Sequence, residues 1–255
     1  MRRNKLVRGE IGGRKSVLTA ILVLLLPFNI LKAQTSLPFS VGERLIYSVF
    51  FNFIRGGKSC LEVAGIDTID KKPVYHIKSR TESGAFFDRI FKVRDYMESW
   101  VDIEGIYSRK FSKSLREGRY RKQYSVLFDY DNLRAVSPYD TVAIDGIIHD
   151  GLALFYYVRT IDFSLGDIID LNYFDNDSQR PFKIKVEKIE KVRVPAGVIE
   201  CFVLTPFAEK GSLFKNKNLV TIHLSTDEKR LPVMISNEAR FGAMVLKLES
   251  VELPN

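Results

Sequence analysis

The chain has 255 residues and a formal net charge of +8, with 45% hydrophobic and 27% charged residues. This balance is typical of a globular protein and excludes a wholly disordered chain, and two cysteines are too few for a small disulfide-stabilised fold. A basic chain suggests a nucleic-acid partner, so the position of the charge has to be examined.

The first 33 residues predict a secretory signal peptide. Basic side chains come first, an apolar run over 17–26 follows, and the small residue Ala33 suits the position before a signal-peptidase cut. The run is shorter than the about 20 residues of a membrane-spanning helix, although an uncleaved N-terminal anchor is the alternative. Removing seven basic residues and Glu10 from the totals of 39 and 31 leaves 32 basic and 30 acidic side chains. We therefore expect a nearly neutral exported protein, most simply periplasmic, without a nucleic-acid partner or a later transmembrane helix.

Residues 34–255 predict a single, mainly β domain. Runs rich in Val, Ile, Tyr and Phe alternate with charged residues and end at Gly, Asp or Asn, which is the pattern of short antiparallel strands. We expect a meander that forms a curved sheet or an open or closed barrel. The predicted strands lie near 43–54, 58–67, 73–82, 90–102, 107–116, 119–129, 132–137, 139–145, 168–175, 181–193, 198–207, 218–225, 231–237 and 241–252.

The catalytic candidates in this pattern are few. Glu98 and Asp102 share one strand face because their spacing is even, and two acids on a sheet can act as a glycosidase pair; a solvated strand face is the alternative. His149 lies at a predicted helix start and is the candidate base. None of the three histidines has a second ligand at metal-binding spacing, so we expect no metal and no cofactor.

The most basic stretch predicts a cationic hairpin with its turn at Gly118. Such a surface would bind an anionic lipid head group or an envelope polysaccharide through phosphate or carboxylate contacts. The alternative is a solvated edge whose charges discourage strand addition. The candidate residues are Arg109, Lys110, Lys113, Arg116, Arg119, Tyr120, Arg121 and Lys122.

One segment, near 150–160, breaks the β pattern and predicts a helix. Asp150 is a suitable N-cap, and the following apolar residues recur at helical spacing. A helix packed on the sheet is the simpler interpretation, and a lid over a ligand cavity is the alternative. The face consists of Leu152, Phe155, Tyr156 and Arg159.

Two long-range relations can be drawn from the sequence. Segments of 42–116 resemble segments of 166–250 at an offset of 123 to 125 residues, which predicts an internal repeat with the helix at the join, although alternation by chance is the alternative. Cys60 and Cys201 both lie in predicted strands. They would form a disulfide in an oxidising compartment if their Cα atoms were close enough, and two separate buried thiols are the other interpretation.

Several segments in this order resemble an uncharacterised exported bacterial family, the domain-of-unknown-function family 3108. They are Gly42–Val49, Tyr96–Asp102, Arg116–Tyr120, Asp150–Thr160, Val194–Gly197 with Cys201, and Leu224–Val233. Gly151 departs from the family, which tends to carry proline there. The resemblance implies export and a β-rich fold but no catalytic residues. Two turn phrases are also similar to periplasmic lipoprotein-carrier proteins, whose curved sheets hold acyl chains under a helical lid.

These observations favour a non-enzymatic envelope protein that binds a lipid or another amphiphilic or anionic envelope ligand. The 18 phenylalanines, the single helix and the cationic hairpin motivate this hypothesis. A structural or protein-interaction module of the envelope is the second hypothesis. A hydrolase that uses Glu98 and Asp102, or His149, is the third. The sequence does not determine the oligomeric state.

Overall fold

The computed structural model describes residues 37–207, 219–239 and 242–254. The predicted signal peptide therefore lies outside the described residues. The chain forms fourteen strands and two helices within those residues. The first half contains β1 (Arg44–Phe51), β2 (Ile54–Ile69), β3 (Lys72–Ser83), α1 (Ala85–Asp88), β4 (Arg94–Asp102), β5 (Ser108–Glu117), β6 (Tyr120–Asp129), β7 (Arg134–Val136) and β8 (Thr141–Ala143). The second half contains α2 (Gly151–Thr160), β9 (Ile168–Asp175), β10 (Ser178–Val194), β11 (Gly197–Phe207), β12 (Leu219–Ser225), β13 (Pro232–Ala239) and β14 (Gly242–Glu252).

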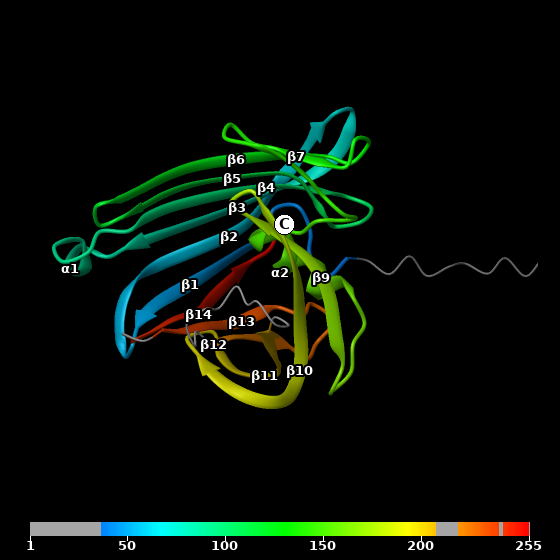
Figure 1. Ribbon diagram of the computed structural model, residues 1–255. Coiled ribbons are helices and arrows are strands. Elements are labelled where there is room, and N and C mark those ends of the chain that lie inside the picture. The colour runs from blue at the N-terminus through cyan, green and yellow to red at the C-terminus, as the bar shows by residue number, and fades with distance from the viewer. Residues whose placement is uncertain (1–36, 208–218, 240–241, 255) are drawn as a thin grey trace, which may run out of the picture. The chain divides into compact units, whose positions relative to one another are not determined.

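All fourteen strands belong to one antiparallel sheet with the order β8-β7-β6-β5-β4-β3-β2-β1-β14-β13-β12-β11-β10-β9. Consecutive strands are neighbours in the sheet except β8 and β9, which lie at its opposite edges, and β1 pairs with β14 to join the two halves. The prediction of a mainly β meander is confirmed, and the sheet is open because β8 and β9 form its two edges. Figure 1 shows how the sheet curves around α2. No helix in the described parts of the chain has the length and hydropathy of a membrane span.

Helix α2 forms where the sequence predicts it. The carboxylate of Asp150 caps it by accepting hydrogen bonds from the backbone N–H groups of Leu152 (2.8 Å) and Ala153 (3.0 Å). The Ser99 and Ser108 hydroxyls also donate to this carboxylate, at 2.6 and 2.7 Å, and anchor the helix start to β4 and β5. Burial raises the pKa of Asp150, although its four hydrogen bonds act in the opposite direction.

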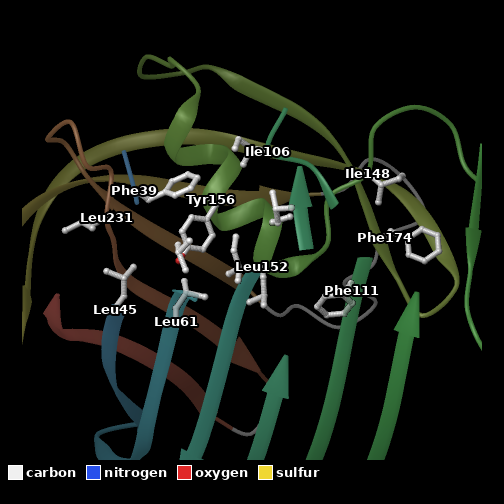
Figure 2. Packing of buried hydrophobic residues seen from close by; sticks show 14 of the residues in the cluster. Phe39, Leu45, Leu61, Ile106, Phe111, Ile148, Leu152, Tyr156, Phe174 and Leu231 are labelled. Carbon is white, nitrogen blue, oxygen red and sulfur yellow. The ribbon is translucent and has the colours of Figure 1, made fainter. Parts of the chain in front are cut away.

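The main hydrophobic core lies between α2 and the face of the sheet that surrounds it. Figure 2 shows this cluster, in which Tyr156 and Leu152 of the helix meet Leu45 and Leu61 of the sheet. A second cluster packs the other side of α2 against β9 to β12. Because both clusters contain residues of α2, the helix packs against both halves of the sheet and stabilises their association.

A buried ion pair fixes the end of α2. The Arg159 guanidinium donates to both Glu43 carboxylate oxygens, at 2.7 and 2.9 Å, and both side chains are only 1% exposed. It also donates to the carbonyl oxygens of Pro38 (2.8 Å) and Lys229 (3.1 Å). One side chain therefore ties the helix to the start of β1 and to the β12–β13 loop.

The two halves share an unusual local geometry at their long hairpins. The Gly42 N–H donates to the Val63 carbonyl (2.8 Å), and the Gly166 N–H donates to the Val186 carbonyl (2.9 Å), 123 or 124 positions later. A bulge follows Val63 in β2, and another follows Val186 in β10. Bulges bend a strand locally, so both hairpins change direction at corresponding positions.

Candidate functional site

One basic side chain of the hairpin strands, that of Arg109, is buried. Arg109 is 7% exposed, and its Nε donates to the Asp102 carboxylate at 2.7 Å. Its Nη2 donates to the Tyr107 hydroxyl at 2.6 Å. Burial opposes the ionisation of Asp102, but hydrogen bonds from Arg109 and from two backbone N–H groups outweigh it and lower the pKa of this carboxyl. Arg109 is therefore a structural cation.

Two lysines of the hairpin bind the chain's own β9–β10 turn. The ammonium of Lys113 pairs with Asp175, and that of Lys122 donates to the side-chain oxygen of Asn176. Between them, the Tyr124 hydroxyl donates to Asp177 at 2.9 Å. We call these contacts the seam, since they join β5 and β6 to the far end of the sheet. The predicted cationic patch needs correction here, because these lysines already have partners within the molecule.

The remaining residues of the predicted cationic patch differ in exposure and in their contacts. The Lys110 ammonium lies 4.3 Å from the centre of the Trp100 ring, a cation–π contact. Only the residues around the β5–β6 turn, Arg116, Arg119, Tyr120 and Arg121, are exposed. The structure thus reduces eight candidates to a four-residue group at one turn.

These residues belong to a larger exposed apolar surface that the sequence analysis missed. Figure 1 shows α1, the β1–β2 turn and the β5–β6 turn at the left-hand end of the sheet. Phe53 at the β1–β2 turn is 98% exposed, Phe86 of α1 is 66% exposed, and Ile90 after α1 is 71% exposed. We call this surface the turn end. Its apolar members are Phe51, Phe53, Ile54, Phe86, Ile90, Phe91, Tyr120 and Met244.

Backbone contacts join these turns into one surface. The Asn52 N–H donates to the Ala243 carbonyl at 2.7 Å, which ties the β1–β2 turn to β14. The Gly84 N–H donates to the Gly56 carbonyl at 2.8 Å, which ties the α1 segment to β2. The Gly118 N–H donates to the Lys92 carbonyl at 2.8 Å. The turn end is therefore held in place, although its side chains are exposed.

Gly118 has φ +54, and the Phe91 ring lies where a β-carbon would stand. A side chain here would meet both a strained backbone and that ring, so the turn requires glycine. The close approach presses the segment after α1 against the β5–β6 turn. It is one reason why Phe91 and Tyr120 belong to the same surface.

Cationic side chains lie next to the apolar ones on the α1 segment and the β5–β6 turn, where the Asp95 and Glu117 carboxylates also lie. Five exposed basic residues of the turn end have no ion pair with any residue that the structure describes: Arg89, Lys92, Arg116, Arg119 and Arg121. Arg94 nearby is occupied by Asp88, whose pKa falls to about 2 through hydrogen bonds from Arg94 and Ser83. The turn end therefore combines exposed aromatic residues with unneutralised positive charge.

The predicted helix face packs into the two core clusters. Leu152, Tyr156 and Arg159 are buried, while Phe155 is partly buried and packs with the second cluster. These contacts support the interpretation of α2 as a packed helix.

The two cysteines are free thiols, which contradicts the suggested disulfide. Cys60 lies on β2 and Cys201 on β11, with β1, β14, β13 and β12 between them in the sheet order. Neighbouring strands are spaced by about 4.8 Å, so the two positions are not adjacent across any strand pair. Burial raises the pKa of Cys201 to about 12.

The catalytic candidates do not converge. Glu98 accepts from His76 (2.9 Å) and from Tyr96, whereas Asp102 is held by Arg109. His149 is buried, and burial lowers its pKa to about 4. No described group of three His, Cys, Asp or Glu side chains could hold a metal ion. The arrangement gives no positive evidence of catalysis.

The family model described as a protein of unknown function (DUF3108) matches residues 46–249. A β-barrel-like protein of the unknown-function family DUF1849 from Brucella abortus is 11% identical, with a TM-score of 0.54 over 85% of this chain and 99% of that one. Hypothetical protein CT021 from Chlamydia trachomatis is 8% identical, with a TM-score of 0.38 over 86% and 90%. The first supports the fold alone, and the second is too different to add to it. The curated proteins include no match.

Proposed function

The chain belongs to the DUF3108 family, and we propose that it is an exported, non-enzymatic envelope protein that binds anionic lipid surfaces through its turn end. One observation carries this proposal: exposed aromatic side chains on adjoining turns lie together with five exposed basic residues that have no ion pair among the described residues. The basic and apolar N-terminal segment supports export.

The chemistry of the turn end fits a membrane surface on two counts. Aromatic side chains gain free energy by leaving water for the interface, at about 25 cal/mol per Å² of buried apolar area. Each Lys or Arg near an anionic surface adds about 1 kcal/mol. Exposed apolar side chains gathered in one place mark interaction surfaces in soluble proteins. The five unpaired basic residues supply the complementary charge.

The lipid is proposed to bind at this surface and not inside the fold. The helix face is occupied by core contacts, so an acyl chain would have to displace Tyr156 and Leu152. A turn end requires no such rearrangement. A structural or interaction module, in which the same surface binds an envelope protein, is the second candidate function, favoured by the exposed Phe53.

Co-sedimentation with vesicles tests the proposal. The exported protein is mixed with vesicles of phosphatidylcholine alone, or of phosphatidylcholine and phosphatidylglycerol in equal parts. We expect binding to the second and release by high salt, because exposed charges are screened. Equal binding to both, or to neither, would contradict the proposal. Capture of one defined envelope protein without vesicle binding would favour the interaction module.

Matched variants locate the surface. Arg119→Gln with Arg121→Gln removes two charges and should weaken binding by about 2 kcal/mol, or about thirty-fold. Lys71→Gln with Lys72→Gln removes the same charge from the β2–β3 turn and should leave binding unchanged. Phe53→Ser should weaken binding about tenfold or more through the lost apolar contact. Because Phe53 is almost fully exposed, this change should not alter the unfolding temperature.

A further inference from the structure

The second half of the sheet carries a trough on strands β10 to β13. After its bulge, β10 returns into contact with β13 and β14, although β11 and β12 separate them in the sheet order. The strands β10 to β13 therefore curl, as the lower part of Figure 1 shows. These strands line an open depression of about 550 Å³. Its lining residues are Glu187, Lys188, Glu190, Val203, Thr205, Thr221, His223, Met234, Ser236 and Glu238.

Both halves contain a hydrogen bond between an aromatic ring nitrogen on one strand and a carboxylate on another. In the first half, the Trp100 ring N–H donates to the Asp67 carboxylate at 3.1 Å. In the second half, His223 Nε2 lies 3.0 Å from the Glu190 carboxylate. His223 and Glu190 both stand 123 positions after their counterparts. A strand-to-strand hydrogen bond from a ring nitrogen to an acid thus recurs beside corresponding bulges, so we treat the halves as repeats of one unit.

In the first half, two side chains of the protein cover the two faces of the ring in this hydrogen bond. The His76 ring stacks on Trp100 with 4.6 Å between ring centres, and the Lys110 ammonium lies over the indole. By strand register, Val203 takes the place of His76, and Met234 takes the place of Lys110. Neither of these residues supplies the aromatic ring or the cation that the first half has at these positions. In the second half the His223 ring is 4% exposed, and the hydroxyl-bearing residues Thr221 and Ser236 line the depression beside it.

Hydroxyl groups line the open trough. Thr221 and Ser236 are register partners on β12 and β13, and Thr205 on β11 lies next to them. All three are only partly buried, so their hydroxyls can both donate to and accept from a ligand. Below them, Val203 and Met234 provide a small apolar floor.

The charges at the rim are nearly balanced. The Lys188 ammonium lies 2.6 Å from Glu190, and the Lys185 ammonium lies 2.9 Å from Glu187. Hydrogen bonds from Lys188 and His223 lower the pKa of Glu190, so its carboxylate is an ionised acceptor. Only Glu238 adds a carboxylate without an ion pair among the described residues. An acidic ligand would be repelled, and a neutral one is not.

One buried side chain of the trough has an unsatisfied hydrogen-bonding atom. His223 is 4% exposed, and its Nδ1 has no hydrogen-bond partner among the described residues. Buried ring nitrogens are normally hydrogen-bonded, and an exception marks a site that another molecule or a rearrangement completes.

From these observations we infer that the trough of β10 to β13 is a binding site for a neutral, hydroxyl-rich saccharide. Vicinal sugar hydroxyls would bind the Thr205–Thr221–Ser236 row and the Glu190 carboxylate. The apolar C–H face of the sugar would rest on Val203 and Met234. The trough adjoins the turn end at β13 and β14 but shares no lining residue with it, so variants can test the two binding activities separately.

A glycan array of neutral and acidic oligosaccharides, followed by amide chemical-shift titration, tests this inference with the exported protein. We expect binding to neutral glycans, with shifts confined to β10 to β13. Thr221→Val with Ser236→Ala should weaken binding at least tenfold, and so should Glu190→Gln. Ser112→Ala, at the position of the first half that corresponds to Ser236, should change nothing.

Two outcomes overturn the inference: the absence of any glycan binding, and binding of acidic glycans alone. Shifts outside the trough would also overturn it. If the double variant fails to fold, Glu190→Gln decides, because Glu190 is partly exposed on the rim. Vesicle binding of each folded variant should equal that of the unaltered protein, which separates a failure here from a failure of the lipid proposal.

Discussion

The ion pair of Arg159 and Glu43 offers the sharpest test of the fold. We consider Arg159→Leu, which keeps an apolar stem in the core and removes the guanidinium. The change leaves the Glu43 carboxylate, 1% exposed, without its cation. It also removes the donors to the Pro38 and Lys229 carbonyl oxygens.

Breaking a buried pair by removing one partner costs about 3–5 kcal/mol, because the remaining charge is uncompensated. For a domain of this size, 1 kcal/mol corresponds to about 2–4 °C, so the unfolding temperature should fall by about 6–20 °C. Arg159→Leu with Glu43→Leu removes both charges and should be less destabilised than the sum of the single variants by at least about 2 kcal/mol. The remaining cost of the double variant comes from the unsatisfied carbonyls.

Urea unfolding followed by circular dichroism measures these free energies. Arg134→Leu is the matched control, since Arg134 pairs with Asp129 but is 50% exposed, and it should cost less than about 1 kcal/mol. The reasoning is refuted if Arg159→Leu costs no more than the control. Strict additivity of the two single variants would also refute it, because a coupled buried pair cannot behave independently.

Three further predictions concern titration and processing. Burial holds the pKa of His149 near 4, below the unfolded value of 6.5, so the unfolded state binds more protons. The free energy of unfolding should therefore fall by up to about 3 kcal/mol as the pH drops from 6.5 towards 4. In urea unfolding, His149→Phe should reduce this pH dependence, and an unchanged dependence would contradict the assignment. Thiol titration should find two free thiols in the denatured protein and no rapid reaction of Cys201 in the native one, whereas no thiol in the denatured protein would indicate a disulfide. Mass spectrometry of the exported protein should show a chain that begins at Gln34, and an intact N-terminus would indicate an anchor.

Local patterns were enough to predict the strands and α2. The β strands follow from alternation, because each strand has one face on the core, and α2 follows from the Asp150 cap and the helical spacing after it. Helix α1 was missed because Ala85–Asp88 is one turn long, too short to show a period. The predicted strand near 90–102 consequently began four residues early, at a segment that precedes β4.

Long-range contacts could not be read in the same way. Lys113 and Asp175 are 62 residues apart, and nothing local to the hairpin indicates that its lysines meet an acidic turn. The turn end depends likewise on which turns adjoin. Phe53 and Phe86 belong to different hairpins, and only the sheet order brings them to one surface. The cluster of basic residues in the sequence therefore predicted an external binding site. In the fold, about half of these residues instead contact other parts of the same chain.

The basic hairpin therefore contains two groups of basic residues, for which we propose different roles. Its strands use Lys113 and Lys122 to hold the seam, whereas its turn exposes Arg119 and Arg121 beside aromatic residues. Neutralising the strand lysines should lower the free energy of unfolding, because Asp175 loses its cation and Asn176 loses its hydrogen-bond donor. Neutralising the turn arginines should lower vesicle binding without that cost. A hairpin that served only as a solvated edge would show neither effect, so the separation of the two variant sets decides between a functional and a merely protective charge.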